Sequence, residues 1–280
     1  MEDIGKLKSR TLYVSDLDGT LLQSNETLSK YTIETISELV DKGMLFSYAT
    51  ARSLVTAKKA TKGLEAKIPL VVYNGAFVMD NVTGEIILSS FFGEDIHLVI
   101  DDLISGGIFP IVYSFIEKKE KFSYIRENST QGVRDFLDTR KGDRRDNPVN
   151  IVEDLHKGDI FYLTCIDNEE RLEGFYEKYK DKYSLVYHKD IYSGEQWLEI
   201  MPKEANKANG IKKLKSFLGC DRLVVFGDGK NDIPMFEIAD EAYAVENAVD
   251  ELKAMATGII EGNNLDGVAK WLRKSKSDLT

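Results

Sequence analysis

The chain has little of what stabilises disulfide-rich, zinc-bound or membrane-spanning proteins. Its 280 residues include two cysteines, three histidines and five prolines. Cys165 and Cys220 lie in different apolar stretches, and no CxxC or HExxH motif occurs, so we expect two buried free thiols in a reducing compartment and no zinc cage. No apolar run approaches the roughly 20 residues that span a bilayer, and MEDIGKLKSR lacks a secretory apolar region. These absences predict a cytoplasmic location and no membrane partner.

The chain also has fewer positively charged than negatively charged residues. The chain has 37 Lys and Arg residues against 47 Asp and Glu residues, a formal net charge of −10. Nucleic acids and anionic membranes bind positive surfaces, so we expect neither as a partner. Hydrophobic residues make up 42% and charged residues 30%, an ordinary globular composition. The length suggests about two domains.

Apolar strands alternate with amphipathic helices at both ends of the chain. The patterns predict strands at 11–15, 44–50, 69–76 and 221–229, helices at 29–43 and 53–62, and a terminal helix in LDGVAKWLRK. This alternation is typical of an α/β fold, here a Rossmann-like parallel sheet with helices on both faces. The middle of the chain reads instead as α+β with antiparallel pairs. We therefore expect a core of residues 1–83 and 193–280, interrupted by an inserted domain of residues 84–192.

Polar residues follow the predicted strands at one end. Asp16 and Asp18 follow the first strand, and Thr50, Asn74 and Asp228 lie at the carboxyl ends of three others. In open parallel sheets ligands bind at the carboxyl ends of the strands, so these residues mark a candidate site.

The stretch DLDGT alone could be a simple Asp-Gly turn. An EF-hand does not fit, because the position that requires glycine holds Leu21, and no P-loop motif occurs. Magnesium does fit, since Mg²⁺ takes oxygen ligands from one or two carboxylates together with substrate phosphate and water. Asp16 and Asp228 could supply those carboxylates.

These residues resemble the four motifs of the haloacid dehalogenase-like hydrolases. The motifs are DLDGT at 16–20, the threonine that ends SYAT at 50, Lys207, and GDGKND at 227–232. The finer resemblance is to the Cof-type phosphatases of that superfamily, through YNGA at 73–76, LEIMP at 198–202 and EGNNLDGVAKWL at 261–272. The insert is similar in position and size to their larger α/β cap. Ala51 and Ala208 depart from the glycines usual after the second and third motifs, and Lys203 competes with Lys207 for the lysine role.

The resemblance implies a role for each site residue. Asp16 would be the nucleophile and a metal ligand, and Asp18 the general acid and base, with its backbone carbonyl on the metal. Asp228 would be the further metal ligand, with Asp232 in support. The remaining residues would bind the substrate phosphate: Leu17, Thr50, Asn74, Gly75, Lys207 and Asn231. Asn231 and Asp232 could instead contact the metal or orient Lys207.

The implied activity is that of a Mg²⁺-dependent phosphatase, acting on a small phosphorylated metabolite through an aspartyl-phosphate. Two alternatives stay open: a phosphomutase that uses the same intermediate, and a non-catalytic sensor of phosphate ligands. Sugar phosphates, pyridoxal phosphate, FMN and nucleotides all remain open as substrates, as does the oligomeric state.

Other polar residues are given structural interpretations. Arg52 is interpreted as structural or solvated, and the charge run KGDRRD at 141–146 as a solvated loop. Tyr192 and Trp197 could line the substrate cavity or pack in the core. His97, His156 and His188 show no metal-ligand spacing along the chain, and we assign none of them a catalytic role.

Overall fold

The chain forms two compact units in its computed structural model, which describes residues 10–64, 66–189 and 194–277. The core unit comprises residues 1–89 and 206–280, and the inserted unit residues 90–205. The boundaries expected from the sequence, 83/84 and 192/193, are earlier than these. Strand β5 (Ile86–Ser89) pairs with a core strand, and strand β11 (Gln196–Met201) pairs with strands of the inserted unit.

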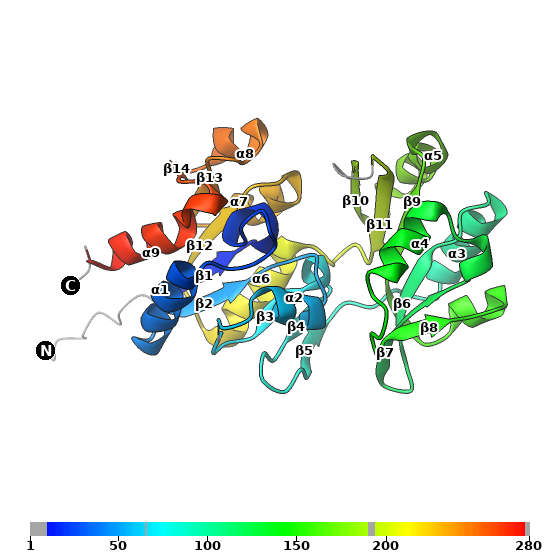
Figure 1. Cartoon of the computed structure of the whole chain (residues 1–280), viewed down its shortest axis with the longest axis horizontal. Helices are drawn as coiled ribbons and strands as arrows, with labels where there is room; N and C mark the ends of the chain where they lie inside the picture. The colour runs from blue at the N-terminus through cyan, green and yellow to red at the C-terminus, as the bar shows by residue number, and fades with distance from the viewer. Residues whose placement is uncertain (1–9, 65, 190–193, 278–280) are drawn as a thin grey trace, which may run out of the picture. The chain divides into compact units, whose positions relative to one another are not determined.

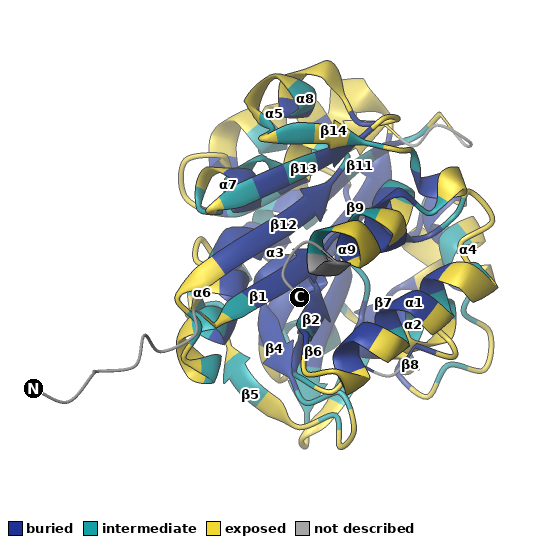
Figure 2. Ribbon diagram, turned by 90° about the vertical axis from the view of Figure 1, so that its left-hand side faces the viewer, coloured by how far each residue is buried: buried dark blue, intermediate teal, exposed yellow. Residues whose placement is uncertain are grey.

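A five-stranded parallel sheet forms the centre of the core unit. Its order is β14-β13-β12-β1-β2, and β1 pairs with β12 on one side and with β2 on the other. Figure 2 shows the central strands buried over most of their length. The predicted α/β fold is thereby confirmed. The strands are β1 (Thr11–Ser15), β2 (Leu45–Tyr48), β12 (Arg222–Gly227), β13 (Glu241–Val245) and β14 (Gly258–Ile260).

Helices cover both faces of this sheet. Crossover connections between parallel strands are right-handed, and the chain moves one way from β1 to β2 but the other way from β12 to β13. The connecting helices therefore lie on opposite faces. The last helix packs beside the first (Figure 1). The helices are α1 (Lys30–Asp41), α2 (Leu54–Ala60), α6 (Lys207–Leu218), α7 (Ile233–Glu237), α8 (Asp250–Met255) and α9 (Gly267–Ser277).

The third predicted strand is shorter than expected. Strand β3 (Leu70–Val72) ends before Tyr73, and the segment η2 (Tyr73–Gly75) turns the chain back into β4 (Phe77–Met79). All three residues of this turn have positive φ. The expectation of one strand over 69–76 missed the reversal, although its Asn74-Gly75 pair is typical of tight turns. The result is a small antiparallel sheet, β3-β4-β5, next to the main sheet.

The inserted unit is built on a six-stranded sheet of order β10-β11-β9-β6-β7-β8. All its pairings are antiparallel except that of β7 with β8. Apolar residues of α3 (Ile96–Ser105) and α5 (Glu169–Tyr179) pack with strand residues in one buried cluster. The other elements are β6 (Ile111–Ile116), β7 (Lys119–Tyr124), α4 (Gln131–Asp138), β8 (Asp146–Pro148), β9 (Asp159–Asp167) and β10 (Ser184–Lys189).

The structure bears on the expectations for the cysteines, for membrane spans and for Trp197 and Tyr192. Both cysteines are free thiols; Cys165 is buried as expected, but Cys220 is only half-buried. Among the described residues, none of the helices combines the length and the apolarity that a bilayer crossing needs. Trp197 lies on β11, next to the ring of Phe136, and Tyr192 falls outside the described residues.

The charge run 141–146 is exposed at four of its six residues, as expected, but Arg145 is buried. The Arg145 side chain is 8% exposed and donates hydrogen bonds to Asp143 and Glu120. Hydrogen bonds from Arg145 hold the pKa of Asp143 below its ordinary value, although burial opposes the shift. One guanidinium thus pairs with two half-buried carboxylates and joins the loop to β7.

Arg145→Ala should destabilise the inserted unit by about 3 kcal/mol, because it removes the buried guanidinium that pairs with Glu120 and Asp143. Urea unfolding followed by circular dichroism measures the effect. The matched control is Arg144→Ala, which removes an exposed neighbour and should cost less than about 0.5 kcal/mol. Equal losses in the two variants would contradict the structural role given to Arg145.

Candidate active site

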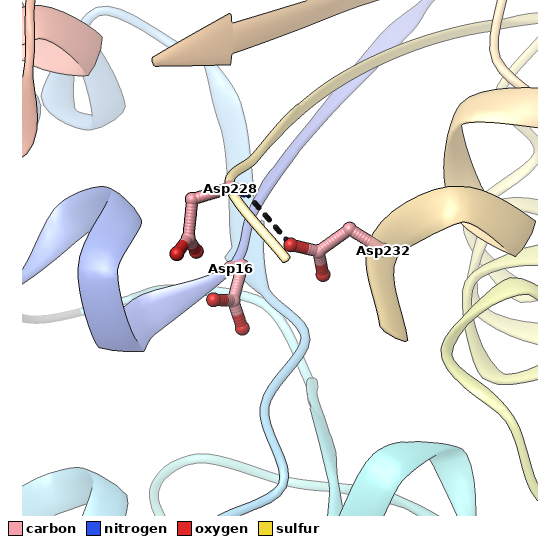
Figure 3. Close-up of side chains that lie close together, drawn as sticks. All are labelled: Asp16, Asp228 and Asp232. Carbon is pink, nitrogen blue, oxygen red and sulfur yellow. Dashed lines mark hydrogen bonds between the residues drawn. The ribbon is translucent and has the colours of Figure 1, made fainter. Parts of the chain in front are cut away.

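Three aspartates meet at the carboxyl ends of two neighbouring strands of the core unit. Asp16 directly follows β1 and Asp228 directly follows β12, strands that pair in register. Asp232 ends the short turn η5 (Lys230–Asp232) before α7. Each offers an oxygen within 4.8 Å of the others (Figure 3). Parallel pairing of adjacent strands is what brings residues 16 and 228 together.

Lys207 joins two of these carboxylates. Its Nζ donates to Asp16 Oδ1 at 2.5 Å and to Asp232 Oδ1 at 2.7 Å, and its side chain is 1% exposed. Lys207 is the first residue of α6, whose N-cap is Asn206. The competing Lys203 is exposed and donates to the carbonyl of Asp181 in the inserted unit. The lysine in contact with the carboxylate cluster is therefore Lys207.

Negative charge exceeds positive charge in this cluster. Burial raises the pKa of Asp16 well above its ordinary value, with Lys207 opposing and the other carboxylates adding to the shift. Burial and Asp232 raise the pKa of Asp228 to about 6. Burial works against the charge of Lys207, but Asp16 and Asp232 raise its pKa above the usual value. Three carboxylates and one ammonium leave a surplus of negative charge, and a divalent cation would neutralise it.

The oxygens of Asp232 are already used within the chain. Oδ1 accepts from Lys207, and Oδ2 accepts from the backbone N–H groups of Asp228 and Gly229 at 2.9 and 3.0 Å. Asp232 thus fixes both the lysine and the loop that carries Asp228. Asp16 and Asp228 are the carboxylates that can direct oxygens toward a cation. Carboxylate oxygens are hard ligands, and such ligands suit magnesium.

Thr20 is a site residue whose contact the sequence did not indicate. Its Oγ1 donates to Asp228 Oδ1 at 2.7 Å across 208 residues. The turn η1 (Leu17–Leu21) permits this approach through Gly19, which has φ +77; a Cβ there would lie 2.9 Å from the carboxyl carbon of Asp228. Asn247 also holds the turn, by donating from Nδ2 to the Gly19 carbonyl at 2.7 Å.

Asp18 lies apart from the buried cluster and pairs with Arg52. Nε of Arg52 donates to Asp18 Oδ2 at 2.8 Å, and Nη2 donates to Oδ1 at 2.5 Å and to Glu26 at 2.7 Å. The Asp18 side chain is 49% exposed. Arg52 is structural, as one of its two interpretations had it, and it sets the direction of the Asp18 carboxylate.

The residues expected to bind phosphate occupy the neighbouring loops. Thr50 is fully buried; its carbonyl accepts from the Asn74 N–H at 2.9 Å and its Oγ1 accepts from the Arg52 N–H at 3.1 Å. The N-cap of α2 is Ser53, so Thr50 does not cap this helix. Leu17 is buried in the turn after β1.

The turn η2 sets the start of α6. Gly75 has φ +95, and a Cβ there would lie 2.5 Å from the carbonyl carbon of Asn206 and 3.1 Å from the nitrogen of Lys207. The glycine thus allows the turn and the lysine-bearing helix to touch. Asn231 is different, since it lies exposed on η5.

A parallel α/β core with an inserted unit, and a buried carboxylate–lysine cluster at the strand ends, define a class of hydrolase. A family model described as haloacid dehalogenase-like hydrolase matches residues 13–272. The chain belongs to this family. Its resemblance to the Cof-type phosphatases is confirmed, and the protein is a phosphatase.

Similar proteins agree with this assignment. Two Bacillus subtilis proteins, YwtE and YitU, are 5-amino-6-(5-phospho-D-ribitylamino)uracil phosphatases. YwtE is 27% identical over 92% of this chain and 95% of its own, and YitU is 26% identical over 94% and 96%. The crystal structure of TM0651 from Thermotoga maritima has a TM-score of 0.74 and 27% identity, and covers 95% of this chain and 97% of its own.

Gly75→Ala should destabilise the core unit by at least about 2 kcal/mol more than Gly43→Ala. Both glycines have almost the same φ, +95 and +94, so both variants carry the cost of a positive φ. A Cβ at residue 43 meets nothing within 4 Å, whereas one at residue 75 overlaps the start of α6. Urea unfolding compares the two variants. Similar losses would show that the contact with Asn206 relaxes without cost.

Proposed function

We propose that this phosphatase is Mg²⁺-dependent and hydrolyses a small phosphorylated metabolite through an aspartyl-phosphate on Asp16. The observation that carries the proposal is the buried contact of Lys207 with Asp16, beside the carboxylate of Asp228. This arrangement puts a nucleophile, a fixed cation and hard oxygen ligands in one place. We also propose a cytoplasmic location and no nucleic-acid partner.

The first half of the reaction builds the covalent intermediate. A carboxylate oxygen of Asp16 attacks phosphorus, and the bond from phosphorus to the substrate oxygen breaks. Asp18 donates a proton to the leaving oxygen, so an alcohol departs. In the second half Asp18 takes a proton from water, whose oxygen attacks phosphorus and releases Asp16 and inorganic phosphate.

The surrounding residues hold the phosphoryl group in line. Lys207 and Thr50 contact its non-bridging oxygens, together with backbone groups of Leu17 and of Asn74 and Gly75, and with Asn231. Asp16, Asp228 and the carbonyl of Asp18 would hold the magnesium ion, which would supply positive charge to offset the negative charge of the phosphoryl oxygens. Asp232 supports the site indirectly, by orienting Lys207.

The substrate is proposed from the relatives. Both named Bacillus subtilis relatives are phosphatases of 5-amino-6-(5-phospho-D-ribitylamino)uracil, a phosphomonoester on a sugar-alcohol chain. We propose a phosphomonoester of this size class and take this compound as the first to test. A panel of sugar phosphates, pyridoxal phosphate, FMN and nucleotides ranks it against the other candidates.

Asp16→Asn should reduce phosphate release from p-nitrophenyl phosphate by at least about 10³-fold, because the amide is a poor nucleophile. EDTA should abolish release by the wild type, and added Mg²⁺ should restore it. The control is Asp41→Asn, which neutralises an exposed aspartate of the same unit that pairs with Lys67.

Three results would count against this mechanism. Release that persists in EDTA would contradict the metal requirement, and release by Asp16→Asn would contradict the covalent step. Isomerisation of a sugar phosphate without net release of phosphate would identify a mutase.

Thr20→Val should raise the Mg²⁺ concentration needed for half-maximal activity by about 10- to 100-fold, because it removes the hydrogen bond that orients Asp228. Thr35→Val is the matched control, since this threonine is equally buried and its Oγ1 has no hydrogen-bond partner among the described residues. The measurement is a Mg²⁺ titration at saturating substrate. Unchanged Mg²⁺ dependence in Thr20→Val would show that Thr20 does not support the metal ligand.

A further inference from the structure

Glu26 is linked to Asp18, the proposed general acid and base, through the guanidinium of Arg52. Nη2 of Arg52 donates to Glu26 Oε2 at 2.7 Å and to Asp18 Oδ1 at 2.5 Å. Nε of Arg52 donates to the other carboxylate oxygen of Asp18 at 2.8 Å. Both oxygens of Asp18 are therefore held by one planar group, and the same group is held by Glu26.

The backbone of Arg52 is fixed on both sides of the residue. Its N–H donates to Thr50 Oγ1 at 3.1 Å, and its carbonyl accepts from the Tyr73 N–H at 3.0 Å. The guanidinium lies at the far end of a long side chain, so its position depends on the carboxylates that it contacts. Asp18 is the carboxylate to be positioned, and Glu26 is the one that can hold the guanidinium against it.

The loop of residues 22–27 keeps Glu26 in an unusual conformation. The Gln23 N–H donates to the Thr27 carbonyl, and the Glu26 N–H donates to the Gln23 carbonyl, each at 2.9 Å. Asn264 fastens the loop, since it accepts from the Ser24 N–H and donates to Ser24 Oγ. Glu26 has φ +60, a left-handed conformation that residues other than glycine seldom adopt and that is concentrated at functional sites. A glutamate where the backbone suits glycine indicates a use for its side chain.

We propose that Glu26 is a positioning residue for the reaction: it holds the guanidinium of Arg52, which in turn orients the Asp18 carboxylate for its two proton transfers. This inference rests on the proposed function, because it needs Asp18 to be the acid and base. A bidentate arginine fixes the plane of a carboxylate as well as its distance. The Glu26 side chain is 70% exposed, and exposed ion pairs add little stability, so the contact serves orientation more than folding.

The choice of substrate separates the two proton transfers. p-Nitrophenolate is a weak base that leaves without a proton, so p-nitrophenyl phosphate can phosphorylate Asp16 without help from Asp18. Hydrolysis of the aspartyl-phosphate still needs a base that takes a proton from water. A displaced Asp18 should therefore slow only the second half of the reaction with p-nitrophenyl phosphate, and both halves with a sugar phosphate.

Glu26→Gly tests the proposal, because glycine suits φ +60 and preserves the loop. In stopped-flow assays with p-nitrophenyl phosphate we expect a first turnover as fast as that of the wild type. Steady release should then be about 5- to 20-fold slower than in the wild type, less than the roughly 100-fold that a 1 Å misplacement can cost. The urea midpoint of unfolding should not fall. Glu117→Gly makes the same change at an exposed glutamate with φ +49 in the inserted unit, and should leave both phases unchanged.

Arg52→Lys shows whether Glu26 acts through Arg52. Lysine keeps the charge but cannot form the bidentate pair, so the slow second half should appear in this variant too. Adding Glu26→Gly to Arg52→Lys should then slow steady release by less than about twofold more. Independent effects of the two changes, a slow first turnover in Glu26→Gly, or an unchanged second half would each overturn this inference and leave the proposed mechanism in place. No phosphate release by the wild type would overturn the proposed function and this inference with it.

Discussion

The ammonium group of Lys207 is the point on which the candidate site depends. It lies between Asp16 and Asp232, and so it links the first strand, the helix that follows the insert and the loop after β12. Buried ion pairs often add little net stability, because the loss of hydration offsets much of the attraction. Here a second carboxylate shares the cation, and backbone N–H groups hold that carboxylate. The arrangement therefore suits a preorganised site better than it suits a stabilising contact.

Glycine and threonine make this arrangement sterically feasible. Gly19 lets the turn after β1 approach the Asp228 carboxylate, and Gly75 lets a second turn touch the start of α6. Thr20 then uses the first close approach to donate to Asp228. Two glycines and one hydroxyl near the strand ends thus help to place Asp228 and the start of the helix that carries Lys207.

Much of the core unit could be predicted from the sequence because its signals are local. Strand β1 has the predicted bounds, and α1 begins after Ser29, whose side chain accepts from the Thr32 N–H. The reversal after β3 was missed although Asn74 and Gly75, which have positive φ there, form a pair typical of tight turns. Asp16, Lys207 and Asp228 could be proposed together because each lies in a recognisable motif.

The contacts that sequence patterns missed join residues far apart in the chain. Arg52 and Asp18 are separated by 34 positions, and Arg145 and Glu120 by 25. Pairing in three dimensions changes the meaning of these residues: an arginine in a polar run becomes the partner of buried carboxylates. The same holds for His97 and His156, which are separated by 59 positions and whose Nδ1 atoms share a hydrogen bond.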